Sequence, residues 1–177
     1  MKIAITGYSG SGKSTLAEIA GRYYKADILH LDTVHFLPGW VERNTESEQK
    51  IVKDFLNQHD SWVIDGNYSR LSYDRRMEEA DQIIMLLFNR FTCLARVTRR
   101  YFKYRHKTRP DMAVGCREKL DREFIQWVFW KGRSKRARDR YRQVRGCYAD
   151  KVIVLKNQRQ LDQFIKRLGM SSQTEQQ

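Results

Sequence analysis

The chain has 177 residues, 41% of them hydrophobic, and carries a formal net charge of +13. This length suits one compact domain with its own core, and no apolar run approaches the roughly 18 residues that would span a bilayer. Three widely spaced cysteines form no CxxC pair and lie near no histidine pair, which argues against a zinc site or a disulfide framework. The first residues, MKIAIT, lead directly into glycine and lack the long apolar region of a secretory signal. We therefore expect a cytoplasmic protein with reduced thiols and no membrane partner.

Apolar strands and amphipathic helices alternate along the sequence. Strands are expected at 2–6, 27–32, 61–65, 82–88 and 151–155, and the helix that begins at Thr45 has Glu48 in a capping-box position. Helices are also expected at 14–24, 70–80, 90–107, 117–145 and 158–168, with a loop at 33–40. Continuously apolar strands that alternate with helices are typical of a parallel sheet covered on both faces. We predict one α/β domain over residues 1–170, with a basic helical lid at about 90–145 and a disordered tail at 171–177.

The positive charge is concentrated in that basic region. Residues 90–145 contain 19 Lys and Arg against 5 Asp and Glu, whereas the rest of the chain contains 15 against 16. A concentrated positive field implies an anionic partner, such as the phosphates of a nucleotide, of a substrate or of a nucleic acid. Part of it, residues 131–145, is equally typical of a solvated helix surface. Trp127, Trp130 and Tyr141 lie among these charges and either stack on bases or pack in the core.

A glycine-rich loop follows the first expected strand. Residues 7–14, GYSGSGKS, match G-x-x-x-x-G-K-[ST] at every fixed position, between a strand and a helix as the motif requires. Glycines let the backbone curl so that its N–H groups point at phosphate oxygens, and the helix that follows adds its own N-terminal donors. Lys13 would bring charge to the outer phosphates and Ser14 would bind Mg²⁺. The predicted nucleotide-binding residues are Gly7, Tyr8, Ser9, Gly10, Ser11, Gly12, Lys13, Ser14 and Thr15.

Two aspartates end neighbouring strands of the expected sheet. In open parallel sheets, ligands bind at the carboxyl ends of the strands, where Asp32 and Asp65 fall together with the glycine loop. Asp65 is a candidate for the Mg²⁺ shell. Asp32 is a candidate to hold, or take a proton from, an acceptor hydroxyl. Either residue could instead only cap its strand, and His30 and His35 fit packing roles better than catalytic ones.

The sequence resembles the adenylate-kinase-like P-loop kinases and, within them, the small bacterial DNA topology modulation proteins. The resemblance covers about residues 1–157 and rests on GYSGSGKST, HLDTVHFLPGW, WVIDGNY and LARVTRRYFKYRHKTRPDM. It implies a P-loop NTPase fold with a five-stranded parallel core, a mobile lid, and ATP and Mg²⁺ as cofactors. In WVIDGNYSR the family's arginine arrives one position late, as Arg70, and its proline is absent, so the acceptor need not be a nucleoside monophosphate.

The resemblance also assigns roles to residues outside the loop. Arg96 takes the place of the arginine beside adenine, and Arg100 that of a phosphate-binding arginine. Arg105 and Arg109 would approach from the tip of the lid. Asn157, just after the last strand, lies near the place where the family holds adenine.

Three functions are consistent with these features. The leading hypothesis is an Mg²⁺-dependent kinase that transfers the γ-phosphate of ATP to an anionic small-molecule acceptor, with Lys13, Asp32, Arg96 and Arg100 as catalytic residues. The second is a nucleotide-dependent nucleic-acid-binding protein or ATPase that uses the basic block, and the third is a nucleotide-binding protein without transfer activity. The residues expected to line the acceptor pocket, whose types fit a sugar, a nucleoside or a phosphorylated metabolite, are Trp40, Arg43, Asn67, Tyr68 and Arg70.

Overall fold

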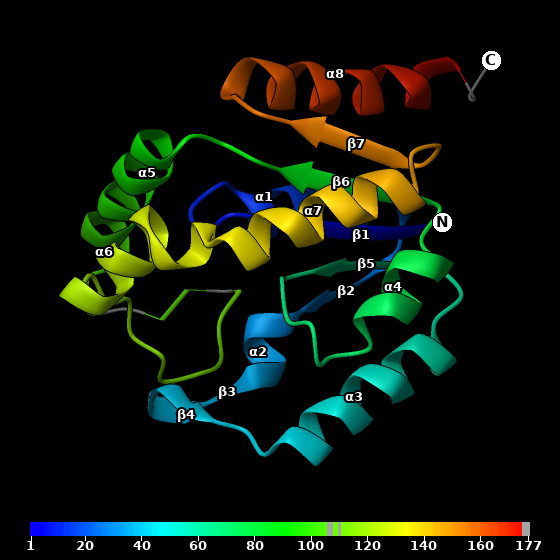
Figure 1. Cartoon of the computed structure of the whole chain (residues 1–177). Helices are drawn as coiled ribbons and strands as arrows, with labels where there is room; N and C mark the ends of the chain where they lie inside the picture. The colour runs from blue at the N-terminus through cyan, green and yellow to red at the C-terminus, as the bar shows by residue number, and fades with distance from the viewer. Residues whose placement is uncertain (106–107, 110, 175–177) are drawn as a thin grey trace.

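The computed structural model describes residues 1–105, 108–109 and 111–174 and is built on a five-stranded parallel sheet (Figure 1). The strand order is β2-β5-β1-β6-β7. The strands are β1 (Lys2–Gly7), β2 (Asp27–His30), β5 (Trp62–Asp65), β6 (Gln82–Leu86) and β7 (Val152–Leu155). The predicted fold class is confirmed. Because all five strands run the same way, their carboxyl ends lie at one edge of the sheet.

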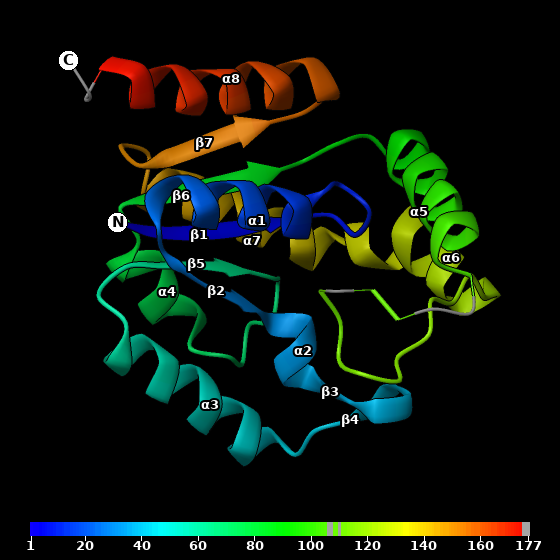
Figure 2. The ribbon, with the colours of Figure 1, turned by 180° about the vertical axis from the view of Figure 1, so that it is seen from behind.

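Helices cover both faces of this sheet, because successive strand residues point to opposite faces. In β1, Ala4 packs with one cluster, to which α3 (Thr45–Gln58), α4 (Tyr73–Glu79) and α7 (Lys135–Cys147) contribute. Its neighbours Ile3 and Ile5 pack with the other cluster, formed by α1 (Lys13–Tyr24), α5 (Arg90–Tyr104), α6 (Arg122–Phe129) and α8 (Gln158–Thr174). Figure 2 shows α1 lying across the sheet on this second face.

The basic region between β6 and β7 is not built from two long helices. The first helix, expected at 90–107, ends at Tyr104, and residues 106–107 lie outside the described part of the chain. The prediction of one helix over 117–145 is wrong: α6 ends at Phe129, a short 3-10 turn follows (η2, Lys131–Arg133), and α7 begins at Lys135. The break occurs because Trp130 leaves the helical conformation and Ser134 caps α7 by accepting from Ala137 N (3.3 Å). Helix α7 packs on the sheet through Tyr141 and Val144.

The segment after β2 is more structured than the expected loop. Strand β2 ends at His30, so Asp32 lies in the one-turn helix α2 (Leu31–His35) and not at a strand end. An antiparallel hairpin follows: β3 (Phe36–Leu37), the 3-10 turn η1 (Pro38–Trp40) and β4 (Val41–Glu42). Helix α3 is capped by Asn44, whose side chain accepts from Ser47 N (2.8 Å), one residue before the cap expected at Thr45. Glu48 is therefore released from a capping role and lies buried.

The lid region contacts this hairpin. Trp40 Nε1 donates to the carbonyl oxygen of Arg117 (2.9 Å), and the Cys116 thiol lies 3.3 Å from the carbonyl oxygen of Leu37. The hairpin and residues 111–119 thus meet above the carboxyl edge of the sheet.

At the other end of the chain, α8 continues past the expected end at 168 to Thr174, because no proline interrupts it. The last three residues of the expected tail, 175–177, lie outside the described residues. Within the described part of the chain, no helix is both long and apolar enough to cross a membrane.

Candidate functional site

The loop after β1 has the conformation that its glycines predict. Gly7, Gly10 and Gly12 all have positive φ, at 141°, 78° and 98°. A Cβ on Gly7 would meet Leu86 O at 2.3 Å, and one on Gly10 would meet Cys93 O at 2.7 Å. The glycines therefore allow β6 and α5 to approach the loop closely. Within the loop, Ser11 is fully buried, and its hydroxyl has no hydrogen-bond partner in the described part of the chain.

Several charged side chains act on Lys13 at this edge of the sheet. Its Nζ donates to the carbonyl oxygen of Tyr8 (3.2 Å), so the side chain folds back over its own loop. Burial lowers the pKa of Lys13, while the carboxylates of Asp32 and Asp65 oppose that shift and Arg100 adds to it. Two predicted acidic residues and one predicted lid arginine therefore lie close enough to Lys13 to act on its charge.

The Ser14 hydroxyl and the Asp65 carboxylate form the predicted metal pair. Ser14 Oγ donates to Asp65 Oδ2 (3.0 Å). The other oxygen, Oδ1, accepts from His30 Nδ1 (2.5 Å), and His30 Nε2 donates to Glu18 (3.1 Å). Burial alone would lower the pKa of His30, but the hydrogen bonds to the two carboxylates outweigh it and raise the pKa to about 9. His30, which the sequence suggested was a packing residue, thus holds Asp65 as a charged donor.

Asp32 lies at the start of α2 and is held by Tyr68, which donates to Asp32 Oδ1 (2.7 Å). Burial raises the pKa of the Tyr68 phenol well above its ordinary value, and the Asp32 charge adds to the shift. The phenol is therefore a neutral donor at physiological pH. One carboxylate oxygen of Asp32 is fixed in place while the residue stays partly exposed.

Asn67 binds the glycine loop, although the sequence suggested an acceptor-pocket residue. Its Oδ1 accepts from Thr6 Oγ1 (2.5 Å) and from Gly7 N (3.0 Å), and its Nδ2 donates to Gly7 O (2.5 Å). Nδ2 also donates to the Tyr141 hydroxyl (3.0 Å). Asn67 therefore joins the end of β1, the turn after β5 and helix α7. The DGN stretch at a strand end is the signal that could have revealed this role.

Arg96, expected beside adenine, reaches the loop from α5. Its Nη1 donates to Ser11 O (2.6 Å), its Nη2 contacts Gln158 Oε1, and its guanidinium lies 4.5 Å from the centre of the Phe88 ring. Asn157 uses its side chain to cap α8, accepting from Gln160 N (2.9 Å). Gln158, which the sequence gave no reason to select, is therefore the residue after β7 that contacts Arg96.

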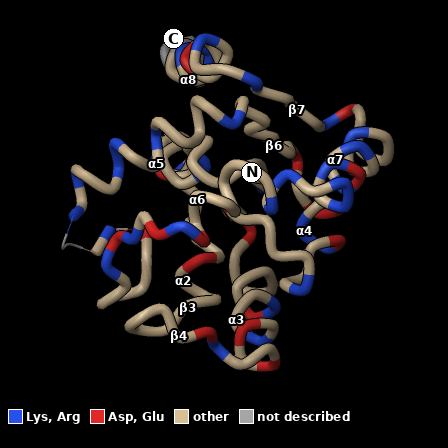
Figure 3. Tube along the Cα trace, turned by 60° about the vertical axis from the view of Figure 1, so that its left-hand side comes forward, with Lys and Arg blue, Asp and Glu red and all other residues tan. Residues whose placement is uncertain are grey.

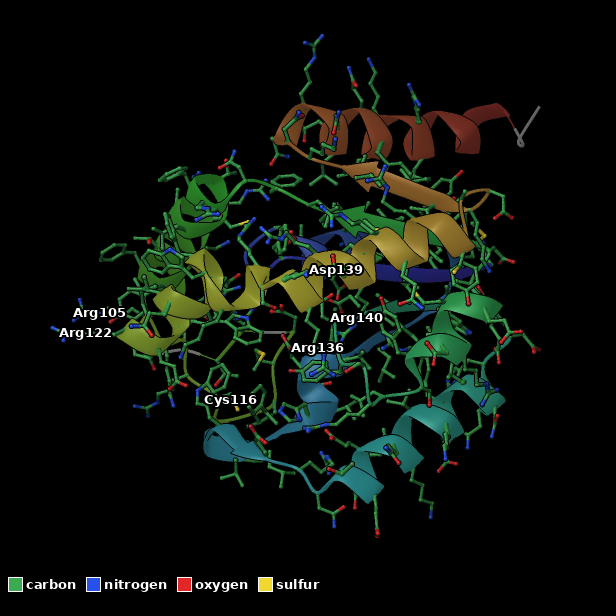
Figure 4. The ribbon with its side chains drawn as sticks, in the orientation of Figure 1. Arg105, Cys116, Arg122, Arg136, Asp139 and Arg140 are labelled. Atoms are coloured by element: carbon green, nitrogen blue, oxygen red, sulfur yellow. The ribbon has the colours of Figure 1, made fainter. Side chains whose placement is uncertain are left out.

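Arg100 and Arg109 share one buried carboxylate. Arg100 Nε and Arg109 Nε lie 2.7 Å from the two oxygens of Glu118, whose side chain is 3% exposed. Arg109 also donates to Asp111 (2.8 Å). Burial lowers the pKa of Arg100, and the nearby charge of Arg109 lowers it further, against the opposing effect of Glu118. Arg105 lies apart from this group, exposed at the outer end of α5 (Figure 4).

Three residues of the lid region and α7 contact the loop from the outside. Trp127 Nε1 donates to Ser9 Oγ (3.1 Å), and the Arg133 guanidinium lies 3.8 Å from the centre of the Tyr8 ring. The Tyr141 ring packs edge-on against Tyr8 at 5.5 Å. The aromatic residue at the second position of the motif is thus held in place by later parts of the chain.

The remaining expected acceptor residues, Arg70, Arg43 and Trp40, contact other parts of the chain. Arg70 forms an ion pair with the fully buried Glu48 (2.7 Å), which also lies 2.9 Å from His35. Arg43 Nε donates to Val34 O (2.7 Å). Trp40 is in the hairpin beneath the lid. Each of these side chains contacts protein groups and so shapes the region without pointing to one acceptor.

Among the described residues, no group of three or more His, Cys, Asp and Glu side chains could hold a metal ion. A cation at Ser14 and Asp65 would therefore need other oxygen ligands. Mg²⁺ commonly takes one or two protein oxygens and completes its shell with water and phosphate oxygens. The donor set of this site fits that ion when a phosphate is also present.

Solved structures with this fold include two that cover nearly the whole chain. Shikimate kinase from Acinetobacter baumannii, in complex with shikimate, is 19% identical over 97% of this chain and 93% of its own, with a TM-score of 0.58. The protein TT1252 from Thermus thermophilus is 14% identical over 99% of this chain and 97% of its own, with a TM-score of 0.53. The chain shares the α/β fold of these two proteins. No protein-family model matches the sequence, and no curated protein is significantly similar to it.

Proposed function

We propose that this protein is an Mg²⁺-dependent phosphotransferase that moves the γ-phosphate of ATP to the hydroxyl group of a small-molecule acceptor. The observation that carries the proposal is the arrangement at the carboxyl edge of the sheet. Ser14 Oγ donates to Asp65 Oδ2 (3.0 Å), Tyr68 holds Asp32 (2.7 Å), and both carboxylates act on the charge of Lys13 in the loop. A protein that only binds a nucleotide as a switch needs the phosphate loop and the Mg²⁺ ligands. Transfer additionally needs an acceptor side, which Asp32 would supply.

The loop fits a nucleotide for reasons independent of the motif. Its three glycines hold a curled backbone, and the buried Ser11 hydroxyl has no protein partner. Lys13 would exchange the Tyr8 carbonyl for phosphate oxygens. Ser14, with Asp65 behind it, would hold Mg²⁺, which when bound neutralises charge on the phosphates.

In the proposed reaction, Asp32 accepts a hydrogen bond, and then the proton, from the acceptor hydroxyl. Tyr68 fixes the carboxylate for this task, and Lys13 and the lid arginines stabilise charge on the transferred group. Arg96 and Gln158 would flank the base. Helices α5 and α6 and residues 111–119 would form the lid over this site, and their contacts with the hairpin would exclude water.

The test is acceptor-dependent ADP release from ATP and Mg²⁺ with a panel of hydroxyl compounds. The panel should contain shikimate, because a protein of the same fold binds it, together with sugars, nucleosides and their monophosphates. We expect one class to give turnover. With that acceptor, Asp32→Asn should lower kcat by about 10²- to 10⁴-fold, the usual contribution of a general base, while nucleotide binding is retained.

Lys13→Ala should lose nucleotide binding as well, and Arg99→Gln, an exposed position on the same α5 helix as Arg96 and Arg100, should behave as wild type. Slow, acceptor-independent ADP release with every compound would refute the kinase proposal and favour an ATPase.

A second candidate function is nucleotide-dependent binding of nucleic acid, as in the topology modulation proteins that the sequence resembles. The observation that favours it is unpaired charge on α7. Of the six Lys and Arg residues of this helix, only Arg142 forms an ion pair within the described chain, with Asp139 (3.0 Å). Figure 3 shows Lys and Arg along α5 and α7. Exposed Trp130 and Phe91 offer rings on which bases could stack.

A further inference from the structure

A second hollow lies away from the phosphate loop, between α4 and α7. It is a cavity of about 220 Å³ lined by Ser69, Tyr73, Asp74, Met77, Arg140, Gln143, Val144, Cys147 and Tyr148. An open groove of about 490 Å³ adjoins it on α7 and shares Arg140 and Gln143 with it. None of these residues belongs to the loop, to the Asp32 side or to the lid arginines. The hollow therefore shares no residue with the proposed phosphate and Mg²⁺ sites.

The cavity contains a buried polar group without a partner. Tyr73 is 8% exposed, and its hydroxyl has no hydrogen-bond partner among the residues that the structure describes. Two guanidinium groups lie near its ring, those of Arg76 at 5.4 Å and Arg140 at 5.6 Å from the ring centre. An unpaired buried hydroxyl destabilises the folded protein unless a ligand supplies the missing acceptor. Burial raises the pKa of Tyr73, and the two arginines only partly offset this, so the phenol can donate a hydrogen bond.

The cations at the shared rim also lack partners within the described chain. Arg136 and Arg140 project from the same, lower side of α7 in Figure 4, and neither forms an ion pair. Asp139 lies in the same groove, but Arg142 already neutralises it (3.0 Å). Asp74 is at the α4 side of the cavity. An anionic group would therefore bind at the α7 rim, with an apolar body directed toward Met77 and Val144.

We propose that the hollow between α4 and α7 is a binding site for a compact organic phosphate with a flat apolar body. The body fills the cavity beside Met77, Val144 and Tyr148. An oxygen of the ligand accepts from the Tyr73 hydroxyl, and Arg140 and Arg136 bind the phosphate. Ser69 on the cavity wall is two residues from Asn67, which holds the phosphate loop, so an occupied cavity borders the segment that positions that loop.

The chain contains its own reporter for this site. Of its three cysteines, Cys93 and Cys116 are buried, and the exposed Cys147 lines the cavity. Phenyl phosphate is a suitable probe, and phenol and inorganic phosphate supply its two halves separately. We expect phenyl phosphate to slow the reaction of Cys147 with a thiol reagent in a saturable manner. Phenol lacks the phosphate that would bind Arg140 and Arg136, and inorganic phosphate lacks the apolar body. Each half should therefore bind at least about tenfold more weakly than phenyl phosphate.

Two variants test the assigned contacts. Tyr73→Phe removes only the unpartnered hydroxyl and should weaken phenyl phosphate binding by about 5- to 10-fold, the usual value of one hydrogen bond. Arg140→Gln should weaken it by about tenfold or more, because hydrogen bonds to charged groups are stronger. Arg145→Gln removes one charge from α7 outside the hollow and should bind like wild type. Thermal unfolding checks each fold, and Tyr73→Phe should unfold no earlier than wild type.

Binding should persist when the loop is saturated with a nonhydrolysable ATP analogue and Mg²⁺, and in the Lys13→Ala variant. Loss of protection in either case would place the probe at the phosphate loop and overturn the proposal. Protection that Tyr73→Phe and Arg140→Gln leave unchanged would overturn it too, as would protection by inorganic phosphate alone at the same concentration. None of these readouts depends on transfer activity, so failure here and failure of the proposed kinase function are distinguishable.

Discussion

At the scale of single residues, the metal side of the site is organised by a histidine. His30 holds one oxygen of Asp65 and Ser14 holds the other, so the carboxylate has a fixed orientation before any cation binds. Sequence reasoning placed Ser14 and Asp65 in one site, because motif and strand-end position are both local signals. It could not identify His30, because the contacts to Asp65 and Glu18 join parts of the chain far apart in sequence.

The charge of His30 makes stability depend on pH. Its pKa is raised from 6.5 in the unfolded chain to about 9 in the folded protein. The corresponding stabilisation is fully present below about pH 6.5 and is lost as the pH rises through about 9. It amounts to roughly 3 kcal/mol at most, at 1.36 kcal/mol per pKa unit.

Urea unfolding at about pH 6 and about pH 10 should show this loss in the wild type and much less of it in His30→Asn. His59→Asn is the matched control, because His59 also has a carboxylate nearby, Asp27 at 3.9 Å, and it should keep the wild-type difference. An equal pH dependence in His30→Asn and wild type would exclude this origin.

At the scale of elements, the loop and helix α5 are packed against each other at Gly10. Gly10 and Gly39 both have a φ of 78°, but only Gly10 has close neighbours. A Cβ on Gly10 would meet Val97 Cγ1 at 2.6 Å and Cys93 O at 2.7 Å, whereas one on Gly39 would meet nothing within 4 Å. Alanine substitutions at Gly10 and Gly39 therefore separate the free-energy cost of the backbone conformation from the cost of a steric clash.

Gly39→Ala should lower the free energy of unfolding by about 1–2 kcal/mol, the cost of a left-handed conformation. Gly10→Ala should lower it by about 3 kcal/mol or more, because overpacking adds about 1–3 kcal/mol. Chemical denaturation measures both values. Equal losses would mean that α5 moves away from the loop at no cost.

The sheet strands and the basic helices differ in how well the sequence predicts them. Apolar runs identified all five sheet strands, because strands buried on both faces have an unambiguous composition. The break between α6 and α7 was missed because residues 117–145 contain no proline and only one glycine, Gly132. The break depends on the conformation of Trp130 and on the Ser134 cap, which the strong helix-forming character of the neighbouring residues conceals.

At the scale of the whole molecule, the basic block serves more than one purpose. Arg96, Arg100 and Arg133 contact protein groups near the loop. Arg138 and Arg145, two turns apart on α7, are exposed and form no ion pair within the described chain. Composition located the block, but only the three-dimensional arrangement divides it into a part that serves the site and a part that faces solvent.

The solvent-facing part gives the nucleic-acid hypothesis its test. If it binds single strands, affinity for a labelled oligonucleotide should fall steeply with salt, with a log–log slope of about −0.7 per neutralised phosphate. Charge reversal at Arg138 and Arg145 should reduce the slope by about 1.4, the value for two phosphates. Arg22→Glu on α1 should have no such effect. If Arg22→Glu reduced the salt slope as much as the α7 charge reversal, or if the wild type did not bind at low salt, α7 would be excluded as the nucleic-acid-binding surface.

Glu118 already occupies the place that an incoming anion would take on Arg100 and Arg109. Any anion that binds these arginines has to compete with a carboxylate of charge −1 that is tethered and buried. A carboxylate metabolite would gain little from the exchange, whereas a phosphate monoester, with a charge of about −1.5 to −2 at neutral pH, would gain more. We therefore expect Glu118 to favour phosphate monoesters over carboxylates as competitors for Arg100 and Arg109.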